Sequence, residues 1–301
     1  MGTDPGTDPG TDPGTEGTHG DTWFGITGSE EWPPKEFDTG TPHSARIYDY
    51  WLGGKDNFAA DRQMGELFLQ QIPSMREMAE ENRHFVTRST HFLADQGISQ
   101  FLDIGTGIPT SPNLHETAQQ VCADARVVYV DNDPVVLAHA RALMVSAPTG
   151  QVAYIDGDIR RPHDLLTVPQ LTRVLDLSRP VGLMLIAILM LIGDDEDPYG
   201  AVATLREALP PGSYLALTHP TQDFDPEAVA VVTGAARGAG MNFTPRHRAE
   251  VQSFFGDWPL EPPGLVPVKA WRPDTEPEAP DSAYYWAGVA RKPGCRRGPA
   301  P

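Results

Sequence analysis

The chain has 301 residues, and 41 acidic residues against 23 Lys and Arg give it a formal charge of −18. Hydrophobic residues make up 40% of the chain, which allows one large or two small folded domains and excludes a wholly disordered protein. The acidic balance argues against a general nucleic-acid binder, because such proteins neutralise phosphates with a basic surface.

The chain begins with a short repeat, since residues 2–13 are three copies of Gly-Thr-Asp-Pro. Glycine and proline in every copy prevent a helix or a strand ladder. We therefore expect residues 1–40 to form a flexible acidic tail, with a partner-binding arm as the alternative. At the other end, residues 293–301 are expected to form a basic disordered tail.

Cysteine and hydropathy patterns exclude further classes. Cys122 and Cys295 are too few for a disulfide framework or a Cys-rich zinc site, and without a His-x-x-x-His pattern we expect no metal. No secretory signal opens the chain. The longest apolar run, residues 181–192, has 12 residues, whereas a membrane span needs about 20. These patterns predict a cytoplasmic protein without a membrane partner.

The first elements predicted along the chain are two helices. Apolar residues recur at helical intervals over residues 44–52, and Gly53-Gly54 ends that segment. A second helix is predicted over Met75–Asp95, with Gly97 after its end. Strands and helices then alternate. Strands are predicted at residues 100–104, 126–131, 152–155, 181–192 and 214–217. This alternation predicts a mostly parallel sheet covered on both faces.

The helices after the first strands are located by their start signals. We expect one to open at Ser111-Pro112, one at Asp133-Pro134, and a third to cover residues 201–209. An Ala-rich helix should run to about residue 239, and Thr244-Pro245 should open another that continues through Phe255. Two last strands are expected near residues 265–271 and 284–290. Because three prolines lie between them, an antiparallel hairpin is favoured over a crossover.

Acidic residues follow the first three predicted strands. Asp103, Asp131 and Asp158 are 28 and 27 residues apart, one strand-helix unit each. Parallel sheets bind ligands at the carboxyl ends of their strands, so we expect the three carboxylates to point into one crevice. The alternative is that these residues merely cap helices at a solvated sheet edge.

The first of these acids precedes Gly105-Thr106-Gly107, a loop in which the backbone can approach a ligand closely. The third glycine of a dinucleotide fingerprint is replaced by Thr110, and Asp103 would repel a phosphate, which argues against a dinucleotide oxidoreductase. S-adenosylmethionine, with its cationic sulfonium and ammonium groups, suits the acidic edge. Asp131 would accept hydrogen bonds from its ribose hydroxyls and Asp158 from its adenine amino group.

Several motifs carry a resemblance. Asp-Ile-Gly-Thr-Gly from residue 103, Val-Asp-Asn-Asp-Pro from 130 and Asp-Gly-Asp-Ile from 156 resemble the binding motifs of class I S-adenosylmethionine-dependent methyltransferases. Residues 44–61 resemble the signature of the S-adenosyl methyltransferase family, formerly domain of unknown function 574, and the similarity covers residues 31–292.

This resemblance implies an α/β, Rossmann-like class I methyltransferase fold. Its sheet would have seven strands, mostly parallel, with a C-terminal antiparallel hairpin and an N-terminal helical lid. The methyltransferase domain would cover residues 41–292, divided into a helical lid over 41–97 and an α/β core over 98–292.

The resemblance also implies which residues bind the cofactor. Asp103, Gly105, Thr106 and Gly107 would hold the methionine part, Asp131 and Asn132 the ribose, Asp158 and Ile159 the adenine. Ala187 would lie under the sulfonium, and Tyr48, Gly53, Gly54 and Asn57 would form a lid across the cofactor.

Methyl transfer needs alignment and water exclusion, and needs a base only if the acceptor must lose a proton. Candidate bases are His115 and His219, the latter at the rim where a substrate would enter; for both the alternative is a structural histidine. His43 and His84 are further candidates. Met190 stands where members of the family tend to carry histidine, so a base used by relatives would be missing here.

We therefore expect an enzyme that transfers a methyl group from S-adenosylmethionine to a small-molecule acceptor in secondary metabolism, leaving S-adenosylhomocysteine. The alternative is a protein that senses the cofactor or acts as a scaffold without methyl transfer.

Overall fold

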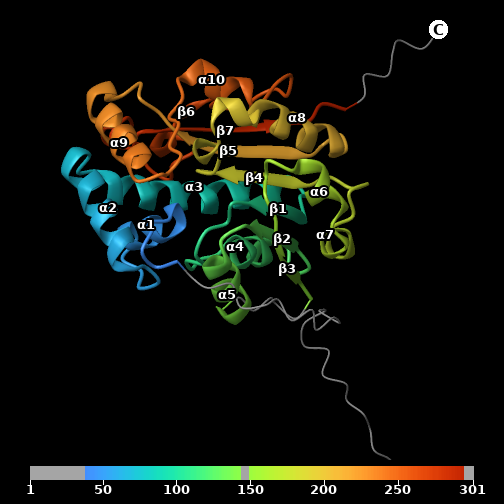
Figure 1. The fold of residues 1–301 in the computed structure, drawn as a ribbon. Helices are drawn as coiled ribbons and strands as arrows, with labels where there is room; N and C mark the ends of the chain where they lie inside the picture. Colours follow the sequence, from blue (N-terminus) through green and yellow to red (C-terminus); the bar gives the residue numbers. More distant parts are fainter. Residues whose placement is uncertain (1–37, 144–148, 295–301) are drawn as a thin grey trace, which may run out of the picture. The chain divides into compact units, whose positions relative to one another are not determined.

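Seven strands form one sheet across residues 38–143 and 149–294, the part of the chain that the computed structural model describes (Figure 1). The strand order is β3-β2-β1-β4-β5-β7-β6. The strands are β1 (Gln100–Ile104), β2 (Arg126–Asp131), β3 (Gln151–Asp156), β4 (Gly182–Ile186), β5 (Tyr214–Pro220), β6 (Val266–Pro267) and β7 (Tyr285–Arg291). Neighbours from β3 to β5 pair in parallel, whereas β7 is antiparallel to both β5 and β6. The predicted mostly parallel sheet with a C-terminal antiparallel hairpin is therefore confirmed.

Helices precede the sheet and connect its strands. They are α1 (Ser44–Trp51), α2 (Ala59–Gln71), α3 (Met75–Asp95), α4 (Leu114–Val121), α5 (Pro134–Leu143), α6 (Pro162–Thr167), α7 (Pro169–Val174), α8 (Pro198–Ala208), α9 (Pro226–Gly238) and α10 (Arg248–Ser253). Short 3₁₀ helices are η1 (Leu189–Leu191), η2 (Asp194–Glu196) and η3 (Val268–Ala270). In the described part of the chain, no helix combines the length and the hydropathy that crossing a membrane requires.

Two apolar cores lie on the two faces of the sheet. Helices α3, α4 and α9 contribute to one core, and α6, α7, α8 and α10 to the other. Side chains along a strand alternate between faces, so Phe101 points to the α3 face while Leu102 and Ile104 point to the opposite one. Asp103 shares the parity of Phe101, and it therefore comes to lie beneath α3.

The strand order reverses between β1 and β4. From β1 the chain builds outward to β2 and β3, and then returns to place β4 on the other side of β1. At such a switch point the loops after the two strands diverge and leave a crevice at their carboxyl ends. In Figure 1 α1 and α3 lie next to this part of the sheet.

The expected strand over residues 181–192 is wrong in its second half. Strand β4 ends at Ile186, and Ala187 adopts a left-handed conformation with φ of 52°. Residues 189–191 then form η1. An apolar run indicates burial, and it does not tell a strand from a short helix that is equally buried.

The last strand pair is also shorter than expected. Only Val266–Pro267 of the predicted strand over residues 265–271 is extended, and η3 follows. Arg88 of α3 donates to the carbonyls of Val268 and Trp271, at 2.9 and 3.0 Å, so these groups are bound to a side chain and not to a strand.

Helix starts differ from those predicted. Helix α4 begins at Leu114 after the N-cap Asn113, and not at Ser111-Pro112; α8 begins at Pro198. Helix α10 begins at Arg248 and not at Thr244, because the Glu250 carboxylate accepts a hydrogen bond from the His247 N–H at 2.7 Å and closes a capping box there.

Helices α2, α6 and α7 were absent from the sequence prediction. In α2 the Asp61 carboxylate accepts from the Phe58 N–H at 2.8 Å and so defines the start of the helix. The predicted tails, residues 1–40 and 293–301, lie outside the described residues except for residues 38–40 and 293–294.

Candidate functional site

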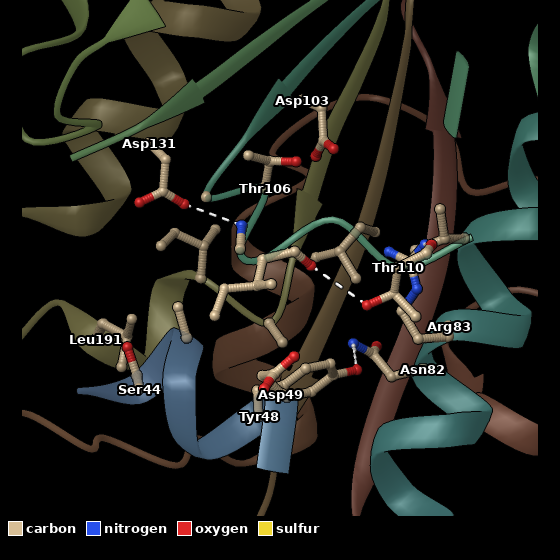
Figure 2. Close-up of a pocket in the computed structure, with 18 of the residues that line it drawn as sticks. Ser44, Tyr48, Asp49, Asn82, Arg83, Asp103, Thr106, Thr110, Asp131 and Leu191 are labelled. Carbon is tan, nitrogen blue, oxygen red and sulfur yellow. Dashed lines mark hydrogen bonds between the residues drawn. The ribbon is translucent and has the colours of Figure 1, made fainter. Parts of the chain in front are cut away.

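A hollow lies at the carboxyl ends of β1 and β4 and is covered by α1 and α3 (Figure 2). A second hollow adjoins it above the ends of β2 and β3. Asp131 and Asn132, at the end of β2, line both. The two hollows are therefore parts of one elongated depression along the sheet edge.

The loop after β1 forms the floor of the first hollow. Gly105 has φ of +78°, and a Cβ atom there would lie 2.5 Å from the Ile188 side chain. Any larger residue would therefore push the loop away from the end of β4. The next glycine, Gly107, donates its N–H to Asp131 Oδ2 at 2.9 Å, which joins the loops after β1 and β2.

Asp103 is the acid at the end of β1, and it is only 9% exposed. Burial raises its pKa to about 7, although the Arg83 charge and a hydrogen bond from the Thr106 side chain oppose this shift. Asp103 therefore exchanges its proton close to neutral pH and gains most from a ligand that brings a positive charge.

Arg83 of α3 was missed in the sequence. Its Nη2 donates to the carbonyls of Thr110 and Pro112, at 2.7 and 2.8 Å. These bonds hold the guanidinium at the rim of the first hollow, on the side where Figure 2 shows Thr110 and Asn82. The periodicity of α3 counted only apolar residues, and so gave no sign that a cation on the same helix faces a site.

Asp131 accepts two backbone hydrogen bonds. Its Oδ1 accepts from the Asp133 N–H and its Oδ2 from the Gly107 N–H, both at 2.9 Å. Burial raises its pKa, and these two bonds oppose the rise. Each carboxylate oxygen has a second lone pair, so the group can still accept hydrogen bonds from a ligand.

The predicted convergence of three acids holds for Asp103 and Asp131 in the first hollow, whereas Asp158 lies in the adjoining compartment of the depression. Strand β3 ends at Asp156, and Asp158 lines only the second hollow. Arg160 donates from Nη2 to Asp158 Oδ2 at 2.6 Å and from Nη1 to Glu196 Oε1 at 2.9 Å. Burial favours a higher pKa for Asp158, but the bonds from Arg160 outweigh it and the pKa is lowered.

The lid residues divide into two groups. Tyr48 lines the first hollow; its hydroxyl donates to the Ala79 carbonyl at 2.8 Å and accepts from Asn82 Nδ2 at 3.1 Å, and burial raises its pKa to about 12. Gly53, Gly54 and Asn57 do not line either hollow. Gly54 and Asn57 contact Asp49, which does line the first, whereas Gly53 donates its N–H to the Tyr50 carbonyl at 3.1 Å.

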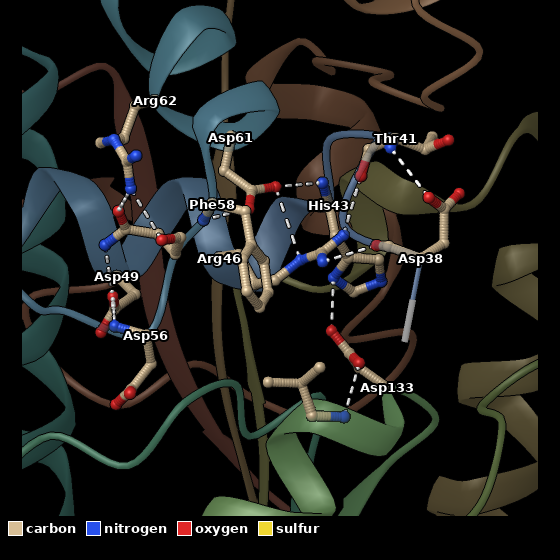
Figure 3. Close-up of polar contacts among 12 residues, drawn as sticks. Asp38, Thr41, His43, Arg46, Asp49, Asp56, Phe58, Asp61, Arg62 and Asp133 are labelled. Atoms are coloured by element: carbon tan, nitrogen blue, oxygen red, sulfur yellow. Dashed lines mark hydrogen bonds and ion pairs between the residues drawn. The ribbon is translucent and has the colours of Figure 1, made fainter. Parts of the chain in front are cut away.

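Helix α1 is fastened by a buried arginine (Figure 3). Arg46, 5% exposed, donates to the carbonyls of Asp38 and Thr41 at 2.9 and 2.8 Å. Its Nε lies 3.4 Å from Asp61 of α2, whose carboxylate also accepts from the His43 N–H at 2.8 Å. The segment before α1, α1 itself and α2 are thereby held together.

A second contact fastens α1 to the sheet side. His43 Nδ1 lies 2.9 Å from Asp133 Oδ2, and Asp133 Oδ1 accepts from the Val135 N–H at 2.8 Å at the start of α5. Burial favours a higher pKa for Asp133, but the bonds from His43 and Val135 outweigh it and the pKa is lowered. The segment before α1 is therefore joined to the loop after β2.

Ala187 lies where the sequence placed the sulfonium, and it lines the first hollow. Its left-handed φ of 52° is strained for a residue with a Cβ atom. Its N–H is held by the Thr218 carbonyl at 3.2 Å and by the Thr218 hydroxyl at 3.0 Å. Strain of this kind persists where the neighbouring structure enforces it, commonly at ligand sites.

Comparisons with known proteins agree with this architecture. The profile of the S-adenosyl methyltransferase family matches residues 30–293. The chain belongs to this family.

Two solved structures are similar over most of the chain. A domain-of-unknown-function 574 protein from Streptomyces avermitilis is 44% identical, with a TM-score of 0.83 over 85% of this chain and 99% of that one. A candidate methyltransferase from Thermobifida fusca is 41% identical, with a TM-score of 0.80 over 87% of this chain and 99% of that one. No curated protein matches the chain. This S-adenosyl methyltransferase therefore has the class I fold and uses S-adenosylmethionine.

The predicted rim position of His219 is wrong in this methyltransferase. His219 is fully buried; its Nδ1 lies 2.8 Å from the Pro220 carbonyl and its Nε2 3.0 Å from Arg246 Nη1. Burial lowers its pKa to about 3, so it stays neutral, with Nδ1–H donating and Nε2 accepting. It has no access to a substrate.

The other histidines also differ in place. His115 is 1% exposed against the Tyr129 hydroxyl, 3.0 Å from its Nδ1, and it lines neither hollow. His84 is exposed beside Glu81. Among the histidines within the described residues, only His43 lines the first hollow. Met190 also lines its wall.

Proposed function

We propose that this chain transfers the methyl group of S-adenosylmethionine to a small-molecule acceptor and releases S-adenosylhomocysteine. The observation that carries the proposal is the first hollow, in which the buried Asp103 carboxylate lies near the Arg83 guanidinium. An adjacent anion and cation are what an amino acid's ammonium and carboxylate groups require. The residues present therefore fit the methionine part of the methyl donor.

The rest of the donor fits the continuation of the depression. Asp131 lies where the two hollows join, and its remaining lone pairs suit the two ribose hydroxyls, next to Asn132. Ile159 and Ile192 give the second hollow apolar walls for the adenine ring. Asp158 borders that wall, but its carboxylate is occupied by Arg160, so it orients this cation more than it receives the adenine amino group.

The protein's part in the reaction is alignment. The donor supplies a methyl group on a positively charged sulfur, which an acceptor displaces in line. Ala187, with its backbone held by Thr218, and Met190 would flank the reacting carbon from the β4 side. Tyr48 and the fastened α1 would cover it and exclude water from the other side.

A small acceptor is favoured because both helices cover the hollow. An acceptor must fit in the space that the donor leaves in the first hollow, under α1 and α3. The net charge of −18 supports the exclusion of nucleic acid. We place the reaction in the cytoplasm and in secondary metabolism, and assign it to a domain over residues 41–292 with the lid at 41–97.

Binding and transfer are tested separately. Calorimetry should give micromolar or tighter binding of S-adenosylmethionine and S-adenosylhomocysteine, and absence of binding would contradict the proposal. The protein is then incubated with methyl-labelled donor and a cell extract. Label that moves into a product only when the protein is present supports an enzyme. Label that stays in the donor despite binding supports the sensor or scaffold.

A further inference from the structure

The first hollow has one more carboxylate than the methyl donor needs. Asp49 of α1 lines it together with Asp103 and Asp131, and is 6% exposed. Figure 2 draws Asp49 beside Tyr48 on the lid helix, on the side of the hollow opposite Asp103 and Asp131. Under the proposed function Asp103 and Asp131 hold the donor from the sheet side. Asp49 then faces the same space from the acceptor side.

One oxygen of Asp49 is fixed by the lid. Its Oδ2 accepts from the Asp56 N–H at 2.9 Å and from Asn57 Nδ2 at 2.8 Å. Asn57 is itself held, because Arg62 Nη1 donates to its Oδ1 at 3.1 Å and to its carbonyl at 2.8 Å. The carboxylate thus has a single orientation set by three neighbours.

The other oxygen keeps its lone pairs. Within residues 38–143 and 149–294, Oδ1 of Asp49 makes no hydrogen bond. A Cβ atom at position 54 would lie 1.9 Å from this oxygen, so only Gly54 leaves room for it. Gly54 and Asn57, predicted to touch the cofactor, therefore act on the site through Asp49.

Within the described residues no cation contacts this carboxylate directly, although His139, which lies 3.5 Å from Asp56, favours the charged form of Asp49. The two basic side chains at the hollow are engaged elsewhere, His43 with Asp133 and Arg83 with backbone carbonyls. Burial raises the pKa of Asp49, while its bonds from Asn57 and Asp56 oppose the rise. Ala45 of α1 and Leu52, its C-cap residue, add apolar side chains to the wall of the hollow. A buried anion with an unused oxygen needs a donor or a proton from a ligand.

We propose that Asp49 is the acceptor-side base of this methyltransferase, and that the acceptor is a largely apolar molecule whose nucleophilic oxygen or nitrogen carries a hydrogen. The inference rests on the proposed function. The acceptor O–H or N–H donates to Oδ1 of Asp49, which directs the lone pair at the methyl carbon. As the new bond to carbon forms, the sulfur–carbon bond breaks, its electron pair stays on sulfur, and Asp49 takes the proton. An acceptor that presents a carboxylate is repelled by Asp49.

The test uses two donor analogues, so it needs no knowledge of the acceptor. S-adenosylhomocysteine has no group at the position of the transferred methyl. Sinefungin replaces the methylated sulfonium by a carbon that bears an amino group, which points toward the acceptor side. If Oδ1 of Asp49 faces that position, it accepts a charge-assisted hydrogen bond from this amino group. Calorimetry on the full chain gives the ratio of the two dissociation constants.

The wild-type protein should bind sinefungin at least about tenfold more tightly than S-adenosylhomocysteine. Asp49→Asn keeps the shape and the acceptor for Asp56 and Asn57, and it should abolish this preference while changing the affinity for S-adenosylhomocysteine less than twofold. The matched control is Asp56→Asn, which removes one negative charge from the segment between α1 and α2 at a residue that does not line the hollow. This variant should keep the preference.

Three results would overturn the assignment of Asp49: no preference in the wild type, which needs no variant to measure; an unchanged preference in Asp49→Asn; or an equal loss of both affinities, which indicates a purely structural role in the lid. Failure of the wild type to bind either analogue would instead overturn the proposed function, so the two failures are distinguishable.

Discussion

The carboxyl ends of β1 and β2 differ from that of β5 in whether the hydrogen-bonding groups of their polar side chains are all paired within the chain. At the end of β1, Asp103 has a raised pKa, and at the end of β2, Asp131 keeps lone pairs that face a hollow. At the end of β5, His219 is equally buried and equally polar, but both of its nitrogens are bound within the chain.

The end of β5 is closed by a cation that the chain itself supplies. Arg246, 1% exposed, donates to the carbonyls of Leu189 and Ile192, both at 2.9 Å, and to Asp194 at 2.6 Å. Its guanidinium also lies 5.5 Å from the centre of the Phe254 ring. A polar strand end thus becomes a ligand site only where the protein leaves its hydrogen-bonding capacity unused, and the following predictions examine that difference.

The largest effect is expected at the closed end. Arg246→Met should lower the free energy of unfolding by about 3–5 kcal/mol, because two carbonyls, His219 and Asp194 lose their donor. Urea unfolding measures the change. Arg160→Met is the control, since its side chain is 39% exposed and its loss should cost less than about 1 kcal/mol. Equal losses of unfolding free energy in the two variants would show that burial does not make Arg246 contribute more to stability than Arg160.

At the open end, the effect should fall on binding. Asp131→Ala should weaken the binding of S-adenosylhomocysteine by about 1.5–3 kcal/mol through the loss of a charge-assisted contact. Calorimetry measures it, with Asp195→Ala, an exposed acid outside both hollows, as the control. Unchanged affinity in Asp131→Ala would contradict the proposed contact between Asp131 and the ribose.

Donor affinity should depend on pH because of Asp103. Below its pKa of about 7 the group is protonated and must lose its proton to meet the donor's ammonium, so affinity should fall about tenfold for each pH unit below that value. Asp103→Asn should flatten the profile between pH 5 and 7. A profile that keeps its slope in this variant would assign the titration to another group.

The same shift has the opposite sign for the stability of the ligand-free protein. The folded state holds the Asp103 proton more tightly than the unfolded state. The contribution of Asp103 to the free energy of unfolding is therefore greatest below the ordinary aspartate pKa, and it should decline as pH rises toward about 7. Thermal unfolding of the wild type and Asp103→Asn across this window separates the contribution of this group from that of the remaining acids.

The smallest effect is expected on ligand affinity when His219 is replaced. His219→Gln should change the affinity for S-adenosylhomocysteine less than twofold, because the side chain lines neither hollow and stays neutral with a pKa of about 3. The measurement is calorimetric, with Asp131→Ala as the positive comparison. A large loss would mean that the closed end also contributes to binding.

Residues at strand ends were predictable because topology decides their place. Asp103 and Asp131 follow apolar strands one strand-helix unit apart, and parallel pairing brings such ends to one edge. Asp158 lies two residues beyond the end of its strand, so its side-chain position depends on a loop contact with Arg160 and not on the pairing of the strands. Thus the motif located the depression, but not which acid keeps free lone pairs.

Residues contributed by helices were harder to predict. Arg83 and Asp49 face the hollow from α3 and α1, whose sequence patterns were judged by apolar spacing alone. The misplacement of His219 has a related cause, since Arg246 comes from a distant segment and its burial is decided by tertiary packing. Partners far apart in the sequence leave no local signal.

The sharing of Asp131 and Asn132 by the two hollows has a consequence for ligands smaller than the whole donor. Under the proposed function methionine would occupy the first hollow, and adenosine the second hollow and the junction, so neither alone would contact the full sheet edge. Joining them through sulfur turns the second contact into an intramolecular event at high effective concentration. The association constant of the intact nucleoside–amino acid should therefore exceed that of either fragment alone, and metabolites that carry only one half should compete poorly in the cell.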